Sequence, residues 1–455
     1  MEAGSWLLIW VGAYVAAFLL PLALQLKQLA FLPPIAGLVL LALQMNQPSW
    51  LKLLCASLVF LYLMKSAVLL VSGAKLPIGS YLLYFTVWPG MEPLRRRSLG
   101  VGESRSRGAG GGDAGGIFLR GLLWAYVGGG LGLLTALQFD RLGTFIVSWL
   151  GLAAILLLVH FGFSGMLSSM MQLAGYPVKP LFDRPFASRS LREFWTKRWN
   201  RPFVEMDRIL FMDPLRKRFG MRGAVFGVFL ISGLLHEMAI SYPAGAGWGM
   251  PLAYFALQGV LTLAEGKLKL PKVFERPWTW FWILAPLPLL FHDAFRFTFI
   301  VPLFDWIHRM ITAQSLERWI DLLLWALGIG HFLVLIASFQ VPFRLHWREE
   351  LPKLSSFNRK LVWTLGSFTT MTIAAFGTFT LVMHQELMRG DRAALAVACY
   401  IVLFWCVRLG TDIFYYKHAD WPEGPQFVVG HALLNSLFAF LVFGYGGVLA
   451  WHWMT

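Results

Sequence analysis

The run A-V-F-G-V-F-L-I-S-G-L-L-H-E-M-A-I-S, residues 224–241, decides the fold class of this chain. With the two residues before it, it forms a predicted span over 222–241, which is long enough to cross roughly 30 Å of hydrocarbon as a helix. The run also carries two ionisable side chains, His236 and Glu237, inside an otherwise apolar segment. Similar apolar runs recur along the whole sequence, so it predicts an all-α, polytopic integral membrane protein.

The composition agrees with this class. Of the 455 residues, 57% are hydrophobic and 14% are charged, and the mean hydropathy is +0.62. A soluble domain of this size would carry about a quarter charged residues, so a large soluble domain is excluded. The apolar runs predict about 11–12 transmembrane helices, near residues 5–25, 29–45, 50–72, 117–138, 143–163, 222–241, 247–265, 278–302, 319–341, 360–383, 392–410 and 427–452.

Positive charge is concentrated in a few connections between these runs. The net charge is +15, and residues 176–222 alone hold twelve Lys and Arg against five Asp and Glu. The basic connections at 95–107, 176–222, 267–276 and 344–360 are separated by even numbers of predicted crossings, so all four fall on one side. The positive-inside rule makes that side cytoplasmic. The sequence does not indicate which membrane is used.

Two regions differ from the rest of the chain. The Gly-rich stretch 99–116 is predicted to be a flexible cytoplasmic loop, because it cannot bury enough apolar surface to offset its chain entropy. The block 311–455 holds about four further spans whose role the sequence does not indicate. The cysteines, Cys55, Cys399 and Cys406, lie in predicted spans and have no metal-ligand spacing.

The segment S-L-R-E-F-W-T-K-R-W-N-R-P-F, Ser190 to Phe203, combines cations with large apolar side chains. Its apolar positions recur at helical spacing, which predicts a short amphipathic helix from Ser188 that is bounded by Pro202. Such a helix is typical of a membrane interface, and an anchor without chemistry is one interpretation of it. In this segment Trp195 and Trp199 are expected to pack rather than react.

His236 lies about fourteen residues into its span, or roughly 21 Å from the cytoplasmic end. A deep ionisable residue is costly in a bilayer and therefore marks a candidate functional site. Ser232 lies one turn earlier on the same face, whereas Glu237 faces about 100° away. A purely structural hydrogen-bonding role remains the alternative. H-E-M-A-I lacks the second ligand of an H-E-x-x-H zinc site, so no metal is expected. Competing polar residues within spans are His160, His292, Asp293, His331, Arg408, Asp412, His431 and Asn435.

Several motifs between 181 and 241 resemble the membrane-bound O-acyltransferase superfamily, and in particular its wax synthase-like members. They are L-F-D-R-P-F, S-L-R-E-F-W-T-K-R-W-N, D-P-L-R-K-R and F-L-I-S-G-L-L-H-E, in that order. The resemblance implies that residues 1–310 form the acyltransferase core, with motif region 181–241, and that 311–455 is an additional C-terminal helical block. It also implies that His236 is the catalytic histidine and Asn200 the family asparagine. Lys197 and the Arg201-Pro202 pair depart from the usual pattern and leave the acceptor open.

The expected function is transfer of a fatty acyl group from acyl-CoA to the hydroxyl of a lipophilic alcohol, most simply with formation of wax esters. His236 would act as general base and Asn200 would stabilise the oxyanion, supported by Ser232, Trp199 and Trp195. Acyl-CoA is a co-substrate, and no bound cofactor, metal or nucleic acid is expected. The side chains expected to hold its phosphates are Lys197, Arg198, Arg201, Arg216 and Lys217.

Two alternatives remain open at this point. The acceptor could be a sterol, a diacylglycerol or a polysaccharide hydroxyl. A transporter is the alternative from another class, with Arg408, Asp412, His431 and Asn435 along its path. The sequence leaves the oligomeric state open.

Overall fold

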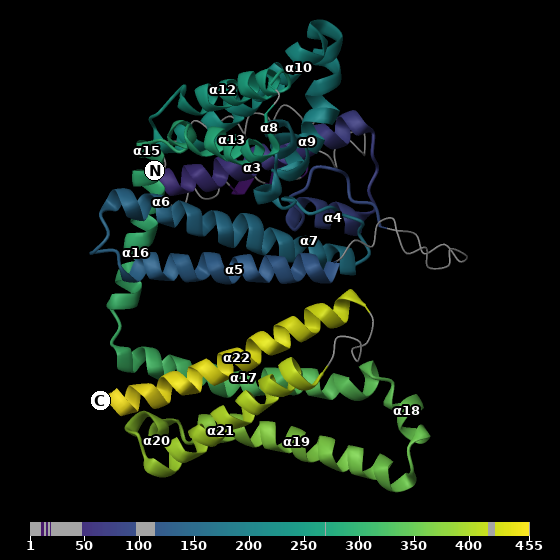
Figure 1. Ribbon diagram of the computed structural model, residues 1–455, viewed down its shortest axis with the longest axis vertical. Helices are drawn as coiled ribbons and strands as arrows, with labels where there is room; N and C mark the ends of the chain where they lie inside the picture. Colours follow the sequence, from purple (N-terminus) through teal and green to yellow (C-terminus); the bar gives the residue numbers. More distant parts are fainter. Residues whose placement is uncertain are drawn as a thin grey trace. The chain divides into compact units, whose positions relative to one another are not determined.

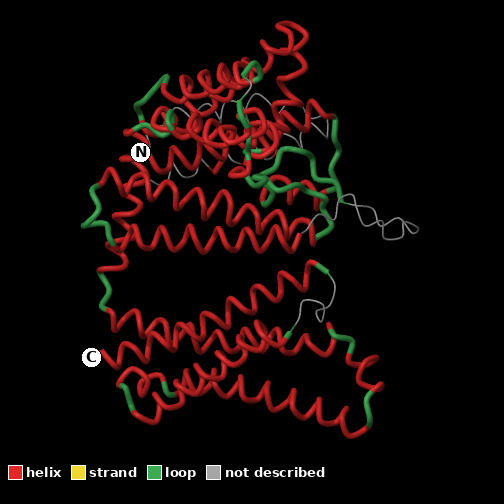
Figure 2. Tube along the Cα trace, in the orientation of Figure 1, coloured by secondary structure: helices red, strands yellow, loops and turns green. Residues whose placement is uncertain are grey.

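A computed structural model describes residues 11–12, 15–16, 19, 48–96, 114–268, 270–416 and 424–454. Every regular element in these ranges is a helix (Figure 2). Eight helices in the described ranges are long and apolar enough to cross a membrane, and a bent pair would provide a ninth span. These observations confirm the predicted class, an all-α polytopic membrane protein.

The predicted spans differ from the observed helices at two places. The span predicted at 247–265 is a helix of 16 residues, α12 (Met250–Glu265). The span predicted at 278–302 is two helical segments, Lys272–Leu290 and Asp293–Thr312, bent by 67°. Two prolines, Pro286 and Pro288, precede this bend, and proline lacks the N–H that continues a helix. The predicted spans 5–25 and 29–45 fall almost entirely outside the described residues.

The chain divides into two compact units, Met1–His308 and Arg309–Thr455. The first contains the motif region, and the second contains the predicted C-terminal helical block. The predicted Gly-rich loop 99–116 lies outside the described residues except at its end. There α5 already begins at Ala114, so the last three residues of that stretch are helical.

In the first unit, α5 packs against a long helix that runs antiparallel to it (Figure 1). The two elements are joined by the short turn 138–143, and glycines allow their backbones to approach closely. A Cβ on Gly128 would lie 2.4 Å from the backbone nitrogen of Leu158, and one on Gly121 would lie 2.8 Å from that of Met166. Small residues at such contacts are typical of membrane helix pairs. The elements are α5 (Ala114–Leu137), α6 (Thr144–Ile155), η2 (Leu156–Phe163) and α7 (Ser164–Leu173).

The other helices of this unit surround the motif region. The long helix α10 packs against α12, and α3 packs against η5 and α11. The buried Lys65 of α3 donates to the carbonyls of Tyr84 and Trp88 and so satisfies the end of α4. The elements are α3 (Ser49–Ser72), α4 (Ile78–Thr86), η3 (Pro185–Ala187), α8 (Leu191–Glu193), η4 (Phe194–Arg198), α9 (Arg201–Asp207), η5 (Arg208–Met212), α10 (Asp213–His236), η6 (Glu237–Ser241), α11 (Tyr242–Ala244), α12, α13 (Lys272–Leu284), α14 (Leu287–Leu290), α15 (Asp293–Phe295), η7 (Arg296–Ile300) and α16 (Val301–Thr312).

The second unit has its own apolar core between four long helices. A buried histidine, His331, lies in this core, where its Nε2 accepts a hydrogen bond of 3.1 Å from the indole of Trp405. The core is therefore not purely apolar, because it contains this hydrogen-bonded pair of polar atoms. The elements are α17 (Leu316–Arg344), α18 (Trp347–Glu350), η8 (Leu351–Lys353), α19 (Ser356–Val382), α20 (His384–Arg389), α21 (Arg392–Gly410), η9 (Thr411–Tyr415) and α22 (Pro425–Met454).

Candidate active site

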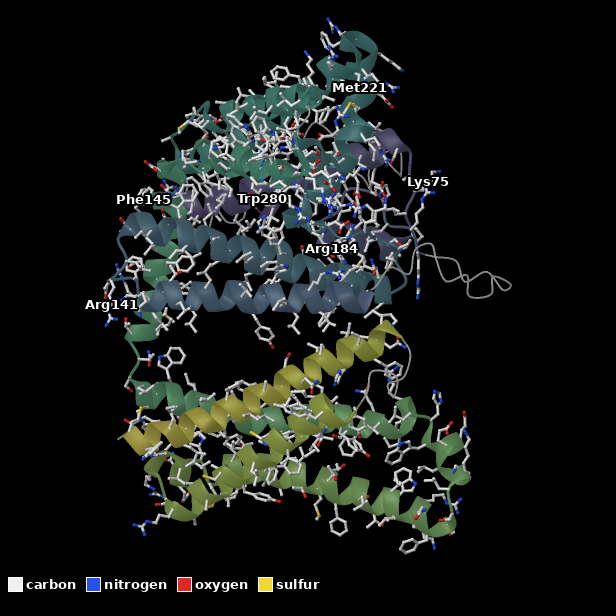
Figure 3. The ribbon with its side chains drawn as sticks, in the orientation of Figure 1. Lys75, Arg141, Phe145, Arg184, Met221 and Trp280 are labelled. Carbon is white, nitrogen blue, oxygen red and sulfur yellow. The ribbon has the colours of Figure 1, made fainter. Side chains whose placement is uncertain are left out.

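Two parts of the motif region are joined through their backbones. The N–H of Asp183 donates to the carbonyl of Arg198 at 2.8 Å, and the N–H of Arg201 donates to the carbonyl of Leu181 at 3.0 Å. Between these bonds Asn200 adopts a left-handed conformation, with φ 41° and ψ 56°. Asparagine tolerates this region better than most residues. The pairing therefore fixes Asn200 at the start of α9. Figure 3 labels Arg184, which follows directly after this pairing.

The helix that precedes Asn200 is capped at its N-terminus by side chains. The hydroxyl of Ser190 accepts from the N–H of Glu193 at 3.0 Å. The carboxylate of Glu265, from the end of α12, accepts from the N–H groups of Leu191 at 3.0 Å and Arg192 at 3.3 Å. An anion at a helix N-terminus also complements the helix dipole. The cap therefore ties the motif segment to α12.

The predicted amphipathic helix is shorter than expected. It covers Leu191 to Arg198, and its second half is a π-helix. Trp199 is extended, with φ −99° and ψ 133°, because the chain turns here to pair with the stretch around Asp183. Pro202 stands at the start of the next helix rather than directly after this one.

The tryptophans of this segment pack against neighbouring side chains. The indole of Trp195 donates to Oε1 of Gln258 at 3.1 Å. The ring of Trp199 stacks on Phe194 with 5.2 Å between centroids, and its edge meets Phe182 at 5.1 Å. Phe194 itself is only 1% exposed. The aromatic side chains therefore form an internal cluster rather than a freely exposed anchor.

His236 is held through its own helix. Its Nδ1 lies 2.7 Å from the backbone carbonyl oxygen of Ser232. A carbonyl oxygen can only accept, so the geometry assigns the hydrogen to Nδ1, and in the neutral ring Nε2 is an acceptor. Ser232, one turn earlier, thus contacts the histidine through its backbone carbonyl, and a role for its side chain stays a prediction. Nε2 has no hydrogen-bond partner among the described residues.

The imidazole of His236 lies among aromatic rings from two other helices. The ring of Phe255, on α12, has its centroid 4.3 Å away, and that of Phe203, on α9, is 6.5 Å away. Phe203 lies on α9 three residues after Asn200, which stands at the start of the same helix. The carboxamide of Asn200 is half-buried and makes no hydrogen bond with other residues in the described ranges.

Glu237 performs a different task from its neighbour in sequence. It is 6% exposed, and its Oε1 accepts from the backbone N–H groups of Gly249 and Leu252, each at 3.0 Å. These N–H groups belong to the first turn of α12, which has no intrahelical partners for them. Sequence reasoning missed this contact. The available signal was Pro251, because proline favours the first turn of a helix.

The approach of α10 to α12 depends on Gly233. A Cβ at this position would lie 2.8 Å from the side chain and 2.9 Å from the Cα of Leu252. The absence of a side chain therefore lets the two backbones meet one turn before His236. Together with the contact of Glu237, this brings Phe255 against the imidazole.

The cations predicted to bind acyl-CoA phosphates fall into two groups. Lys197 is exposed, close in sequence to Asn200. Arg198 binds Glu193 at 2.6 Å and reaches the carbonyls of Asp183 and Arg184 at 3.2 and 3.3 Å, so much of its guanidinium is already engaged. Arg201 forms a longer ion pair, 3.8 Å, with Asp183. Arg216 and Lys217 lie apart from these three in the chain, on the first part of α10, and both are exposed.

Glu193 is the acid partner in this network. Burial opposes its charge, but the N–H of Arg189 and the guanidinium of Arg198 outweigh that effect and lower the pKa of the Glu193 carboxyl. The carboxylate is therefore charged at neutral pH and holds Arg198 in place.

Two of the competing histidines, His331 and His292, have both ring nitrogens engaged. Both nitrogens of His331 are hydrogen-bonded, to the carbonyl of Leu327 at 2.9 Å and to Trp405. Both nitrogens of His292 also have partners, the N–H of Phe295 and the hydroxyl of Ser241. His431 is paired in the second unit with Asp412 at 3.0 Å and Asn435 at 2.8 Å. His160 is exposed. Within the described ranges, no group of three His, Cys, Asp or Glu residues could hold a metal ion.

Comparison with known proteins shows which family the segment around this site resembles. Residues 178–257 match the membrane bound O-acyl transferase family. The matched segment contains Asn200, Ser232, His236, Glu237 and Phe255. The match confirms the predicted resemblance to this family.

Individual relatives narrow the resemblance further. The chain is 35% identical over 131 residues to probable long-chain-alcohol O-fatty-acyltransferase 2 of Arabidopsis thaliana, a match covering 26% of this chain and 36% of that protein. It is 30% identical over 105 residues to the long-chain-alcohol O-fatty-acyltransferase of Simmondsia chinensis, covering 21% and 30%. It is 25% identical over 146 residues to acyl-CoA–sterol O-acyltransferase 1 of Arabidopsis thaliana, covering 28% and 42%. The chain thus spans less than half the length of these curated relatives. The resemblance to wax synthase-like members is confirmed over this part.

Proposed function

We propose that this protein transfers a fatty acyl group from acyl-CoA to the hydroxyl of a lipophilic alcohol. The observation that carries the proposal is the hydrogen bonding of the two ring nitrogens of His236. Its Nδ1 is fixed by the carbonyl of Ser232, while its Nε2 has no hydrogen-bond partner among the described residues. An imidazole held in this way is suited to accept a proton from a substrate.

In the proposed reaction, Nε2 of His236 removes the hydroxyl proton of the acceptor as its oxygen attacks the thioester carbonyl carbon. The new C–O bond forms, and the carbonyl electrons move onto oxygen. When this intermediate collapses, the C–S bond breaks, and the departing thiolate takes the proton from Nε2. The products are the ester and coenzyme A, and the histidine returns to its starting state.

Asn200 is proposed to donate a hydrogen bond from its carboxamide to the negative oxygen of the intermediate. Two observations support this role: the left-handed backbone fixes the point from which the side chain extends, and no described residue occupies the carboxamide with a competing hydrogen bond. Lys197 and Arg201 flank Asn200 in this segment and are proposed to bind the donor phosphates. The positive-inside rule would place these cations at the cytoplasmic face.

A long-chain alcohol is the first acceptor to test, because several of the relatives carry that substrate in their names. A sterol is the second, because one relative is named for it. The whole reaction is tested in membranes that contain the chain, with labelled acyl-CoA and either acceptor. The acceptor that yields labelled ester identifies the substrate class.

The decisive variants are His236→Ala and His431→Ala, which remove a histidine from a membrane helix of the first and second unit respectively. Loss of a general base reduces the rate about 10²- to 10⁴-fold. We expect this loss for His236→Ala and near-normal ester formation for His431→Ala. The proposal fails if His236→Ala forms ester at the wild-type rate, or if wild-type membranes form no ester with any acceptor.

A further inference from the structure

The chain reverses direction at a basic turn, R-K-R-F-G-M-R, residues 216–222, at the beginning of the long apolar helix. Gly220 has φ 69° and ψ 179°, which divides α10 into two helical parts. The side chain of Leu215 lies 3.1 Å from the point where Gly227 would carry a Cβ. In a straight helix these residues would be about 18 Å apart, so the first part of α10 bends back on the second.

This turn protrudes from the first unit (Figure 3, where Met221 is labelled). All seven of its residues are exposed. Phe219 is 58% and Met221 57% exposed, although both are apolar. Arg218 lies over the ring of Phe219, with 5.4 Å to its centroid. The tip of the turn is therefore apolar and is surrounded by cations.

The charge on the turn is strongly one-sided. It carries four cations, and the one acid in residues 213–222 is Asp213, which binds Arg216 at 3.4 Å. The turn directly precedes the apolar run that contains His236. Cations beside exposed apolar side chains are suited to the membrane interface, where phosphate groups lie next to acyl chains.

We propose that the basic turn binds the headgroups of anionic phospholipids, while Phe219 and Met221 enter the adjoining acyl region. The two apolar side chains favour a lipid over the phosphates of coenzyme A, because binding phosphate alone would not require them at the tip. The inference gives Arg216 and Lys217 a role separate from that of Lys197 and Arg201. It is independent of the proposed acyl transfer.

The test measures the polarity around the tip of the basic turn, using the whole chain of 455 residues. Cys55, Cys399 and Cys406 are replaced by serine, Met221→Cys is introduced, and the new thiol receives an environment-sensitive fluorophore. The protein is placed in vesicles of phosphatidylcholine alone or mixed with phosphatidylserine. We expect blue-shifted emission in the mixed vesicles that reverts at about 1 M salt, where the screening length is about 3 Å.

Two charge variants test whether the emission shift depends on the cations of the turn or on the net charge of the protein. Replacing Arg216, Lys217, Arg218 and Arg222 by glutamine should abolish the shift. Replacing the exposed Arg344, Arg348, Lys353 and Lys360 by glutamine removes the same charge from the second unit and should preserve it. If the first variant does not fold, the reversal of the shift by salt still tests whether electrostatic attraction to the anionic vesicle is required.

Coenzyme A is the competing ligand, and it is added to the labelled protein in phosphatidylcholine vesicles. We expect no change in emission. The proposal is overturned if coenzyme A shifts the emission and the four-charge variant abolishes that response. It is also overturned if the emission is the same in neutral and anionic vesicles. Neither result depends on ester formation, so failure here leaves the proposed activity untouched.

Discussion

Oε1 of Glu237 lies 3.0 Å from the backbone nitrogen of Leu252, and this bond fixes the start of the helix that packs against His236. Phe255, less than one turn further along that helix, places its ring 4.3 Å from the imidazole. The adjacent residues His236 and Glu237 thus have separate tasks. His236 is the residue proposed to act on the substrate, and Glu237 holds the neighbouring helix α12 in place.

Removing the carboxylate of Glu237 should loosen the packing of α12 against α10. Glu237→Ala leaves the N–H groups of Gly249 and Leu252 without an acceptor, which should cost about 1–2 kcal/mol of stability, as for other helix caps. Glu237→Gln retains an acceptor oxygen and should lose less. Thermal unfolding in detergent and acyl transfer are measured on both variants. If both lose activity equally while their stability is unchanged, the carboxylate takes part in the chemistry instead.

Adding one methyl group at Gly233 should separate α10 from α12. The Cβ would lie 2.9 Å from the backbone of Leu252, which cannot move without shifting the helix. We expect Gly233→Ala to destabilise the protein by about 1–3 kcal/mol, as overpacking does. Gly130→Ala in α5 is the control, since a Cβ there meets nothing within 4 Å. Equal unfolding temperatures for the two variants would contradict the close approach.

Substitutions of Asn200 can separate the contribution of its backbone conformation from that of its side chain. Glycine adopts the left-handed region easily, so Asn200→Gly preserves the conformation and removes only the carboxamide. If that group stabilises the oxyanion, kcat falls about 10²- to 10³-fold with little loss of stability. Asn200→Ala should lose stability as well. Normal turnover by Asn200→Gly would show that the backbone turn alone is required.

The lowered pKa of Glu193 predicts a pH-dependent contribution to stability. The folded carboxyl loses its proton more readily than the unfolded one, so its contribution is present above the unfolded pKa of about 4.3. It disappears as the pH falls through the folded value. The difference in unfolding temperature between the wild type and Glu193→Gln should therefore shrink on acidification from about pH 7 to below about pH 4. A constant difference would argue against the ion pair with Arg198.

The polar cluster of the second unit is expected to be structural. The side chain of Asp412 is 2% exposed and accepts bonds from Arg408 and His431. Asp412→Ala should cost about 3–5 kcal/mol because it leaves a cation unpaired. Asp391→Ala, which removes an exposed acid, is the control. If Asp412→Ala folds normally and abolishes proton or solute flux in proteoliposomes, the transport alternative gains support.

The class of fold was predictable because the bilayer imposes long apolar runs that are visible without tertiary information. Helical periodicity placed Ser232 and His236 on one face, because residues four apart lie on the same side of a helix. Periodicity does not show which atom makes the contact, however, and the backbone carbonyl turned out to be used rather than the hydroxyl.

The features that were missed depend on residues distant in sequence. Trp199 leaves its helix because its neighbours pair with Leu181 and Asp183, and no local pattern records that pairing. The partner of Glu237 lies across a loop. The bend after Pro286 interrupts an apolar run that, by composition, could have crossed the membrane directly.

The bond between Nδ1 of His236 and the carbonyl of Ser232 has a consequence for the order of events in the proposed reaction. With Nδ1 committed, a single nitrogen must both receive the proton and give it back. The entering oxygen and the departing sulfur must therefore approach the same edge of the ring, one after the other. A geometry in which donor and acceptor flank opposite edges of the imidazole would be unproductive in this protein.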